Sequence, residues 1–398
     1  MFAHQSQQKM NKSIEPYDFD DIRPVYDSEV SATIEELIAC NGLEQALRYV
    51  IPALDWEALK AKLRLCKTKK QFKANISYDL VMTAANLSTR SLTISGGERI
   101  SNDPCMFISN HRDIVLDAAF LNVLLLDIGH EMTRIAIGDN LLIYPWIKPV
   151  FRLNNSFFVK RSVSVRQRLE ESKILSAYIH HSIKDTNESV WMAQREGRAK
   201  DANDTTQTGV LKMLTMAGDR DTLTNLMSLN IVPIAITYEY DPCDYLKAQE
   251  FQQKRDNPDF VKSKRDDLLN MEIGILKQKG RVHFTIARPI NPTLKALPHY
   301  TNKNELIAEI AAIIDREIYA HYRFYPCNYI AYDQLNGIHQ FNAYYDEKEL
   351  MEFEDYIQKQ IDKIELPNKD VSYLRSKMLE MYSNPLKNHV EAGFTSAP

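Results

Sequence analysis

Short apolar runs alternate with amphipathic stretches through the middle of the chain, and this alternation predicts its fold. Runs rich in β-branched and aromatic residues and bounded by turn residues are typical of buried strands. They occupy residues 92–97, 106–109, 134–138, 157–159, 190–193, 231–238 and 280–289. Helical spacing occupies residues 114–126, 140–147, 165–183, 208–217 and 245–279. We therefore expect an α/β fold, with a mixed, mostly parallel sheet flanked by helices on both faces.

The two ends of the chain carry helical patterns without strands. Near the N-terminus these patterns occupy residues 28–38, 43–50, 56–66 and 69–87, and near the C-terminus residues 346–386. Their apolar stripes indicate ordinary packing faces. We expect three parts: a helical N-terminal region over residues 1–90, the α/β domain over residues 91–325, and a helical C-terminal extension over residues 326–398.

Composition narrows the functional classes. The chain has 398 residues, 44% of them hydrophobic, and a net charge of −4, which gives no overall basic surface for nucleic acid. Its five cysteines are scattered without a CxxC pair, which favours reduced thiols in a cytoplasm. Residues 1–16 are polar, and the most apolar stretch is too short to span a bilayer. We expect a cytoplasmic protein that does not cross a membrane.

One stretch places chemically active side chains at a predicted strand end. His111 follows the strand at residues 106–109, and Asp113 and Asp117 lie within reach of its imidazole. A His–Asp pair can remove a proton from a hydroxyl, because the carboxylate fixes the tautomer and stabilises the imidazolium. The same stretch could instead be a helix start preceded by a structural histidine. Taken alone, it leaves both interpretations open.

Cations follow two other predicted strands. Lys160 and Arg161 come directly after one strand, and Arg198 and Lys200 follow another through a tight turn. If parallel strands bring these ends together, a general base faces a cluster of cations. That arrangement suits a hydroxyl compound that carries phosphate. No cysteine or histidine spacing indicates a metal site.

A proline interrupts the apolar strand at residues 231–238. Pro233 cannot donate a ladder hydrogen bond, so it predicts an edge strand or a bulge.

In order and spacing, four stretches resemble the motifs of the glycerolipid acyltransferase superfamily, which includes the glycerol-3-phosphate and lysophosphatidate acyltransferases. The family's motifs are Asn-His followed by four residues and Asp, an aromatic strand ending in Arg, Glu-Gly-Thr-Arg, and a Val-Pro-Ile-like strand. The corresponding segments here are Asn110-His111 with Asp117, residues 157–161, residues 196–198 and residues 232–234. The resemblance covers about residues 91–325.

Two features depart from the family pattern. Five residues rather than four separate His111 from Asp117, so the HX4D motif becomes HX5D. Either the turn absorbs the extra residue and Asp117 orients the histidine, or Asp113 does. Asp117 is favoured, because the apolar stretch after it matches the family's helix. The third motif lacks its hydroxyl, since Arg198 directly follows Gly197.

The resemblance implies an O-acyltransferase of phospholipid biosynthesis. His111 would be the general base and Asp117 would hold its Nδ1. The donor would be acyl-CoA or acyl carrier protein, and the first candidate acceptor is 1-acylglycerol 3-phosphate. Glycerol 3-phosphate and an amino-acid lipid are alternatives. The implied substrate-binding residues are Lys160, Arg161, Glu196, Gly197, Arg198 and Lys200.

The resemblance implies no metal and no cofactor besides the acyl donor, and a position on the inner face of the cell membrane. A membrane-surface scaffold with a degenerate acyltransferase fold is the non-enzymatic alternative. A protein kinase is excluded, because position 118 is Ala where that family needs Asn and no GxGxxG or DFG is present.

Overall fold

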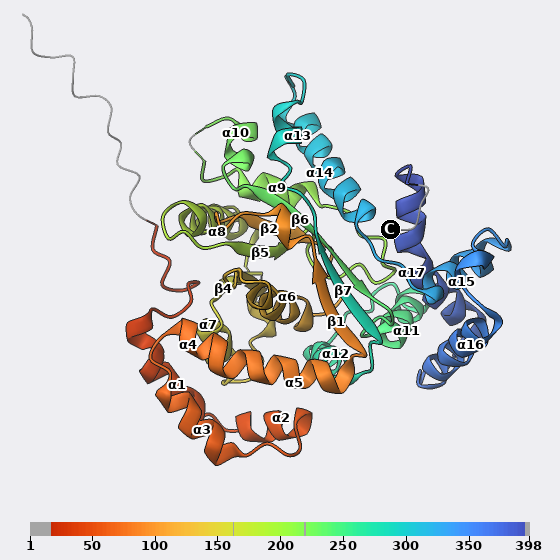
Figure 1. The fold of residues 1–398 in the computed structure, drawn as a ribbon, viewed down its shortest axis with the longest axis horizontal. Helices are drawn as coiled ribbons and strands as arrows, with labels where there is room; N and C mark the ends of the chain where they lie inside the picture. The colour runs from red at the N-terminus through yellow and green to blue at the C-terminus, as the bar shows by residue number, and fades with distance from the viewer. Residues whose placement is uncertain (1–16, 162, 219, 395–398) are drawn as a thin grey trace, which may run out of the picture.

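A seven-stranded sheet lies at the centre of the computed structural model, which describes residues 17–161, 163–218 and 220–394 (Figure 1). The polar segment 1–16 lies outside the described residues. The strands are β1 (Ser91–Ser95), β2 (Met106–Ser109), β3 (Arg134–Gly138), β4 (Ser156–Val159), β5 (Val190–Ala193), β6 (Ile231–Tyr238) and β7 (Arg281–Ile286). Their order is β1-β7-β6-β2-β5-β3-β4, and only the β6–β7 pair is antiparallel. The predicted mixed, mostly parallel sheet is confirmed.

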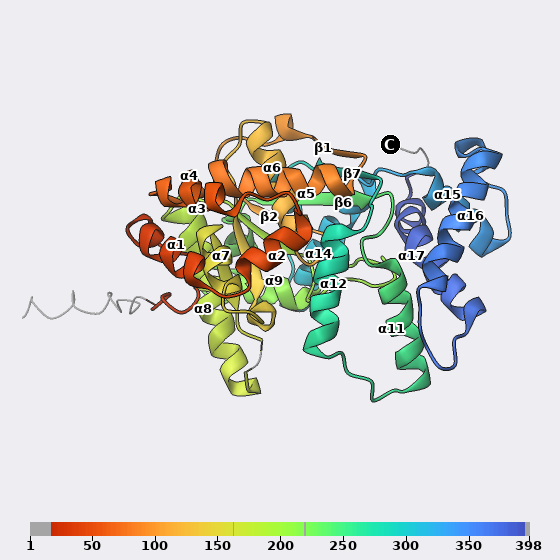
Figure 2. The same ribbon diagram turned by 90° about the horizontal axis from the view of Figure 1, so that it is seen from below.

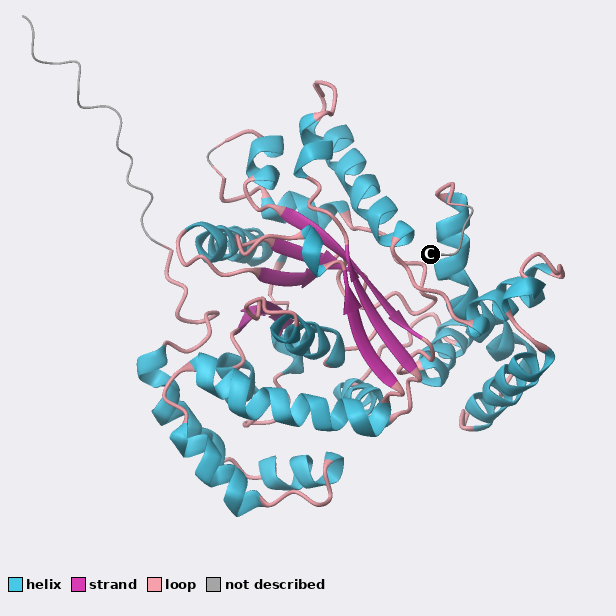
Figure 3. Ribbon diagram, viewed as in Figure 1, coloured by secondary structure: helices cyan, strands magenta, loops and turns pink. Residues whose placement is uncertain are grey.

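Helices cover both faces of this sheet (Figures 1 and 3). One face packs against α8 (Val165–Lys184), α9 (Thr208–Leu214) and α14 (Lys303–Ala320), and the other against α5 (Tyr78–Ser88) and α6 (Leu116–Asp127). Strand β2 illustrates how both faces are buried, because its side chains alternate between them. Met106 and Ile108 pack on the face covered by α8, α9 and α14, and Phe107 packs on the face covered by α5 and α6. No helix in the described part of the chain combines the length and apolar character needed to cross a membrane.

The first N-terminal helices lie on the side of α5 away from the sheet, and the last one runs on into α5 (Figures 1 and 2). They are α1 (Val30–Ala39), α2 (Leu43–Val50), α3 (Trp56–Leu65) and α4 (Lys69–Phe72), followed by one π-helical turn, η2 (Lys73–Ser77). Their core includes Ile34, Leu59 and Phe72 and also takes in Leu153 of α7 (Ile147–Leu153). The predicted continuous helix over residues 69–87 is therefore divided by a π turn, a feature that often occurs at functional sites.

The C-terminal helices pack against a helix of the central domain. They are α15 (Pro326–Asn336), α16 (Glu347–Asp362) and α17 (Val371–Glu391). Their apolar core includes Ile330, Ile357 and Leu374, together with Ala248 of α11 (Asp244–Asp256). The remaining helices are α10 (Thr222–Met227), α12 (Lys264–Leu276) and α13 (Asn291–Lys295), with 3₁₀ turns at η1 (Asp27–Glu29), η3 (Gly97–Arg99), η4 (Asp139–Leu141) and η5 (Asn342–Tyr344).

Three local predictions are wrong, and a proline is involved in each. The helical stretch over residues 245–279 is interrupted, since α11 ends at Asp256, α12 begins at Lys264 and Pro258 lies between them. The segment 140–147 is not one helix: η4 ends at Leu141 and α7 begins at Ile147. Pro145 lies between them, and a proline disfavours helical geometry in the residue before it.

The proline strand lies inside the sheet rather than at its edge, since β6 pairs with both β2 and β7. The carbonyl of Pro233 accepts the N–H of Ala287 over 2.9 Å, one residue beyond the end of β7. The missing N–H of Pro233 therefore lies opposite the end of β7, where the proline forgoes at most one hydrogen bond of the ladder.

Candidate active site

Asn110 fixes the exit of strand β2 from the sheet. Its side-chain amide donates to the carbonyl of Ile236 over 2.9 Å, and its Oδ1 accepts the N–H of Ile236 over 2.8 Å. The side chain thus replaces one backbone step of the ladder between β2 and β6. Because Asn110 is held at both polar atoms, the next residue, His111, leaves the sheet at a defined position.

His111 and Asp117 form a hydrogen-bonded pair. Nδ1 of His111 lies 2.8 Å from Oδ2 of Asp117, which is fully buried in the first turn of α6. The same oxygen accepts the backbone N–H groups of Arg112 (2.6 Å) and Asp113 (3.0 Å). Because an ionised carboxylate only accepts hydrogen bonds, Nδ1 carries the proton and Nε2 keeps its lone pair. Within the described residues, Nε2 has no hydrogen-bond partner.

Asp113 has a different position. Its Oδ1 accepts the N–H groups of Val115 (2.8 Å) and Leu116 (2.7 Å), where α6 begins. Burial, reinforced by the nearby charge of Asp117, raises the pKa of the Asp113 carboxyl group. The turn thus absorbs the extra residue of the HX5D motif, and the structure places Asp117, not Asp113, against the imidazole.

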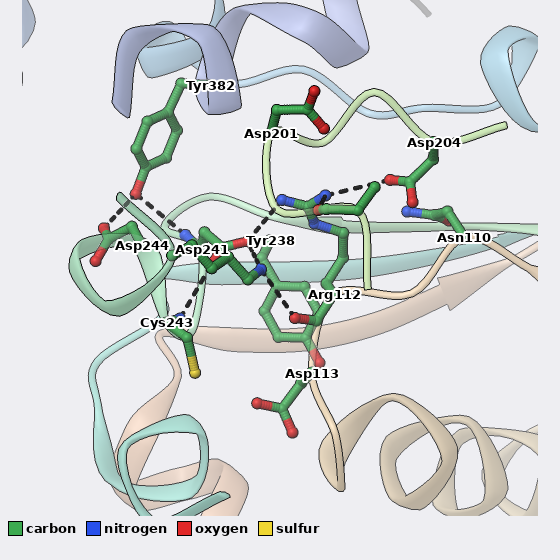
Figure 4. Close-up of polar contacts among 12 residues, drawn as sticks. Asn110, Arg112, Asp113, Asp201, Asp204, Tyr238, Asp241, Cys243, Asp244 and Tyr382 are labelled. Carbon is green, nitrogen blue, oxygen red and sulfur yellow. Dashed lines mark hydrogen bonds and ion pairs between the residues drawn. The ribbon is translucent and has the colours of Figure 1, made fainter. Parts of the chain in front are cut away.

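A buried ion network lies behind the pair (Figure 4). The guanidinium of Arg112 contacts Asp241 over 2.6 Å and Asp204 over 3.2 Å, and Lys247 contacts Asp241 over 2.7 Å. Burial raises the pKa of Asp241, but the charges of Lys247 and Arg112 outweigh it and hold the pKa well below the usual range. The network therefore joins the turn after β2, the loop after β5 and the turn after β6.

The C-terminal extension reaches the same network. The N–H of Asp241 donates to the hydroxyl oxygen of Tyr382 over 3.1 Å, and that hydroxyl donates to Asp244 over 2.7 Å (Figure 4). Helix α17 is thereby anchored to the turn after β6 by polar contacts as well as by its apolar core.

His111 lines a cavity of ≈ 1010 Å³. The cavity continues between the sheet and the N-terminal helices, where its walls are mostly apolar side chains, among them Leu43, Leu59, Leu63, Leu80, Val123 and Ile135. An apolar cavity with a few polar groups at one point is the usual form of a small-molecule site.

The ends of β4 and β5 meet at this cavity. Nε of Arg161, after β4, lies 4.0 Å from Oε1 of Glu196, in the turn after β5. Both side chains are exposed and both line the cavity. Gly197 continues the turn with φ +69°, a left-handed conformation that glycine adopts without strain.

The other predicted cations line the cavity but contact separate partners. Arg198 donates from Nη2 to Oδ1 of Asn270 over 3.0 Å, while its buried Nη1 has no partner within the described residues. Lys200 forms an ion pair with Glu250. Lys160 contacts Asp21 (3.3 Å) and Glu171 (3.2 Å), and Glu171 also lines the cavity. The four cations thus share one cavity without yet sharing one anion.

Two further residues at the site were not selected from the sequence. Arg195 lines the cavity, and its buried Nε has no partner among the residues that the structure describes. Its position directly after β5 was the available signal. Tyr238, the last residue of β6, donates its hydroxyl to Oδ1 of Asp117 over 2.9 Å. Only the adjacency of β6 and β2 reveals that contact.

The comparison with protein families agrees with the resemblance in the sequence. Residues 91–237 match the family described as Acyltransferase. No curated protein matches the chain. Among solved structures, the crystal structure of the 1-acyl-sn-glycerophosphate (LPA) acyltransferase PlsC from Thermotoga maritima is similar at a TM-score of 0.36 and 12% identity, over 73% of this chain and 93% of that chain. Residues 91–237, which contain the His111–Asp117 pair and the turn after β5, therefore form an acyltransferase-family segment of this chain.

Proposed function

We propose that this chain is an O-acyltransferase that transfers a fatty acyl group from an acyl thioester to a hydroxyl of a phosphorylated glycerolipid precursor, with 1-acylglycerol 3-phosphate as the first candidate. One observation carries the proposal. The pair of His111 and Asp117 opens onto a largely apolar cavity whose polar end also holds Arg161 and Arg198. A base, an acyl-sized apolar volume and anion-binding groups are the parts that this reaction needs.

The chemistry follows from the assigned tautomer. Nε2 of His111 accepts the proton of the acceptor hydroxyl while its oxygen attacks the thioester carbonyl carbon. The C–S bond then breaks, and the thiolate leaves with the proton that His111 returns. Asp117 stabilises the imidazolium through Nδ1 and does not itself take the proton. No acyl-enzyme is formed.

The cavity suggests where each substrate lies. The acyl chain fills the apolar part between the sheet and the N-terminal helices, so these helices act with the 91–325 domain as one catalytic unit. The acceptor's phosphate binds at the rim, where Arg161 is exposed and where buried nitrogens of Arg195 and Arg198 have no partner within the described residues. Charge-assisted bonds from guanidinium groups suit phosphate.

A panel of acyl donors and acceptors tests the proposal. Purified protein is incubated with acyl-CoA or acyl carrier protein and with lysophosphatidate, glycerol 3-phosphate or an amino-acid lipid, and products are read by mass spectrometry. Transfer to lysophosphatidate is expected. Transfer to another acceptor alone would replace the assigned acceptor, and no transfer to any of them would favour the scaffold alternative.

A further inference from the structure

A lysine lines the cavity far from the candidate base. Lys73 lies in the π-helical turn η2 and borders the same cavity as His111. In the described part of the chain, its ammonium group makes no hydrogen bond or ion pair. Burial lowers the pKa of Lys73 to about 8. Lys73 is half-buried, and its ammonium group is left without a protein partner at the cavity wall, where a ligand can contact it.

The sheet topology locates this lysine at the opposite end of the cavity from His111. Two of the charges that act on the ammonium group of Lys73 belong to Glu188 and Glu131. Glu188 precedes β5 and Glu131 precedes β3. His111 instead follows the C-terminal end of β2, which runs parallel to β5. At about 3.3 Å per residue, strands of four or five residues separate the two edges by roughly 15 Å. The cavity therefore runs from one edge of the sheet to the other.

The surroundings of Lys73 carry surplus positive charge. Both carboxylate oxygens of Glu188 already have partners. Oε2 accepts from Nε of Arg134 over 2.8 Å, and Oε1 accepts from Asn155 over 2.8 Å. Lys69, one helical turn before Lys73, donates to Asn155 over 3.0 Å. Three cations thus surround one half-buried carboxylate, which leaves Lys73 able to bind a further oxygen.

The other nearby carboxylate and a hydroxyl complete this end. Glu131 is exposed and pairs with Lys70 over 2.7 Å, so it does not neutralise Lys73. Ser156, the first residue of β4, lines the cavity, and its buried Oγ has no hydrogen-bond partner within the described residues. Within the described residues, two polar groups at this end of the cavity, an ammonium and a hydroxyl, therefore have no protein partner.

We propose that the end of the cavity marked by Lys73 and Ser156 binds an oxygen-bearing group, a hydroxyl or a carboxylate, on the acyl chain at its end remote from the thioester. The inference rests on the proposed acyl transfer, because the acyl chain is what fills the cavity. An unsubstituted chain leaves the ammonium buried beside hydrocarbon, whereas an oxygen there forms a charge-assisted hydrogen bond.

Binding without an acceptor tests the inference separately from catalysis. The probes are S-dodecanoyl- and S-hexadecanoyl-pantetheine and their ω-hydroxy and ω-carboxy counterparts, measured by calorimetry. Wild-type protein is expected to bind an ω-oxygenated probe about tenfold more tightly than the plain probe of equal length, the value of one charge-assisted bond. Lys73→Met should abolish or reverse that preference. Lys70→Met, which changes a neighbouring exposed lysine, should retain it.

The outcomes separate this inference from the proposed function. A wild-type protein without the preference, or a Lys73→Met protein that keeps it, overturns the inference. A lower Tm of Lys73→Met with the preference unchanged also overturns it, because Lys73 would then serve only the fold. Preferential binding without transfer to any acceptor would leave this site standing and contradict the acyltransferase assignment.

Discussion

The hydroxyl of Tyr238 donates a hydrogen bond to Oδ1 of Asp117 over 2.9 Å, while Oδ2 of the same carboxylate contacts His111. Burial and the charge of Asp117 raise the pKa of Tyr238 well above its ordinary value, so the hydroxyl stays protonated and remains a donor. Both carboxylate oxygens are therefore fixed as acceptors. This arrangement holds one tautomer of His111, the one that leaves Nε2 ready to accept a proton.

Exchanging each aspartate for asparagine distinguishes the role of Asp117 from that of Asp113. Asp117→Asn should lower kcat by on the order of 10²–10⁴-fold, because an amide permits the wrong histidine tautomer. Asp113→Asn should change kcat little, since the amide oxygen can still accept the N–H groups of Val115 and Leu116. Steady-state kinetics of both proteins check this, and the reverse ranking would show that Asp113 orients the base.

Removing the guanidinium group of Arg198 tests whether this side chain binds the phosphate of the acceptor. Arg198→Ala should raise KM for lysophosphatidate by roughly ten- to a hundredfold, the value of one or two charge-assisted bonds. It should matter little for an uncharged monoacylglycerol. Equal losses on the two acceptors would mean that Arg198 serves the fold through Asn270, or the acyl donor, instead of the phosphate.

The sheet and the histidine pair could be predicted because their signals are local. Each strand is a short apolar run, and the start of α6 five residues after His111 brings Asp117 back to the imidazole. Helix α15 lies within the predicted helical C-terminal extension, although the helical pattern in the sequence begins only at residue 346.

The partners of the cations could not be predicted, because they are distant in the sequence. Arg198 meets Asn270 across 72 residues, and Lys200 meets Glu250 across 50 residues, through helices whose packing no local pattern specifies. Lys73 shows the same limit, since only the assembled cavity reveals it as partly enclosed. Local periodicity predicts elements, whereas the chemistry at their junctions depends on tertiary packing.

His283 should make stability depend on pH. It is buried between β1 and β6 and contacts the hydroxyls of Thr93 and Ser95, and burial, aided by Arg323, lowers its pKa to about 4. The unfolded chain binds this proton near the ordinary pKa of about 6.5. The contribution of neutral His283 to the free energy of unfolding is therefore fully present above about pH 6.5 and is lost as the pH falls towards 4.

The expected loss in the free energy of unfolding is about 2 kcal/mol. It is smaller than the full pKa shift of His283 would give, because solvent still screens part of the ring. Urea unfolding at pH 7 and pH 4.5 should show a smaller difference for His283→Gln than for the wild type. An equal pH dependence in both proteins would mean that His283 is not the group responsible.

Membrane attachment should be peripheral. Exposed Tyr49, Leu65 and Tyr144 lie on the N-terminal helices and on the connector before α7, where they can enter a lipid interface. Carbonate or high salt should release the protein from membranes without detergent, and Leu65→Ser with Tyr144→Ser should weaken sedimentation with vesicles. Release by detergent alone would contradict this view.

The most direct measurement of the central claim is acyl transfer by His111→Ala, read by mass spectrometry beside the wild type on the best acceptor of the panel. Because His111 lies at the cavity wall, the variant should fold, which circular dichroism and an unchanged Tm check. General-base catalysis is worth about 10²–10⁴-fold, so turnover should fall by that factor. A folded His111→Ala protein with near wild-type turnover would contradict the account.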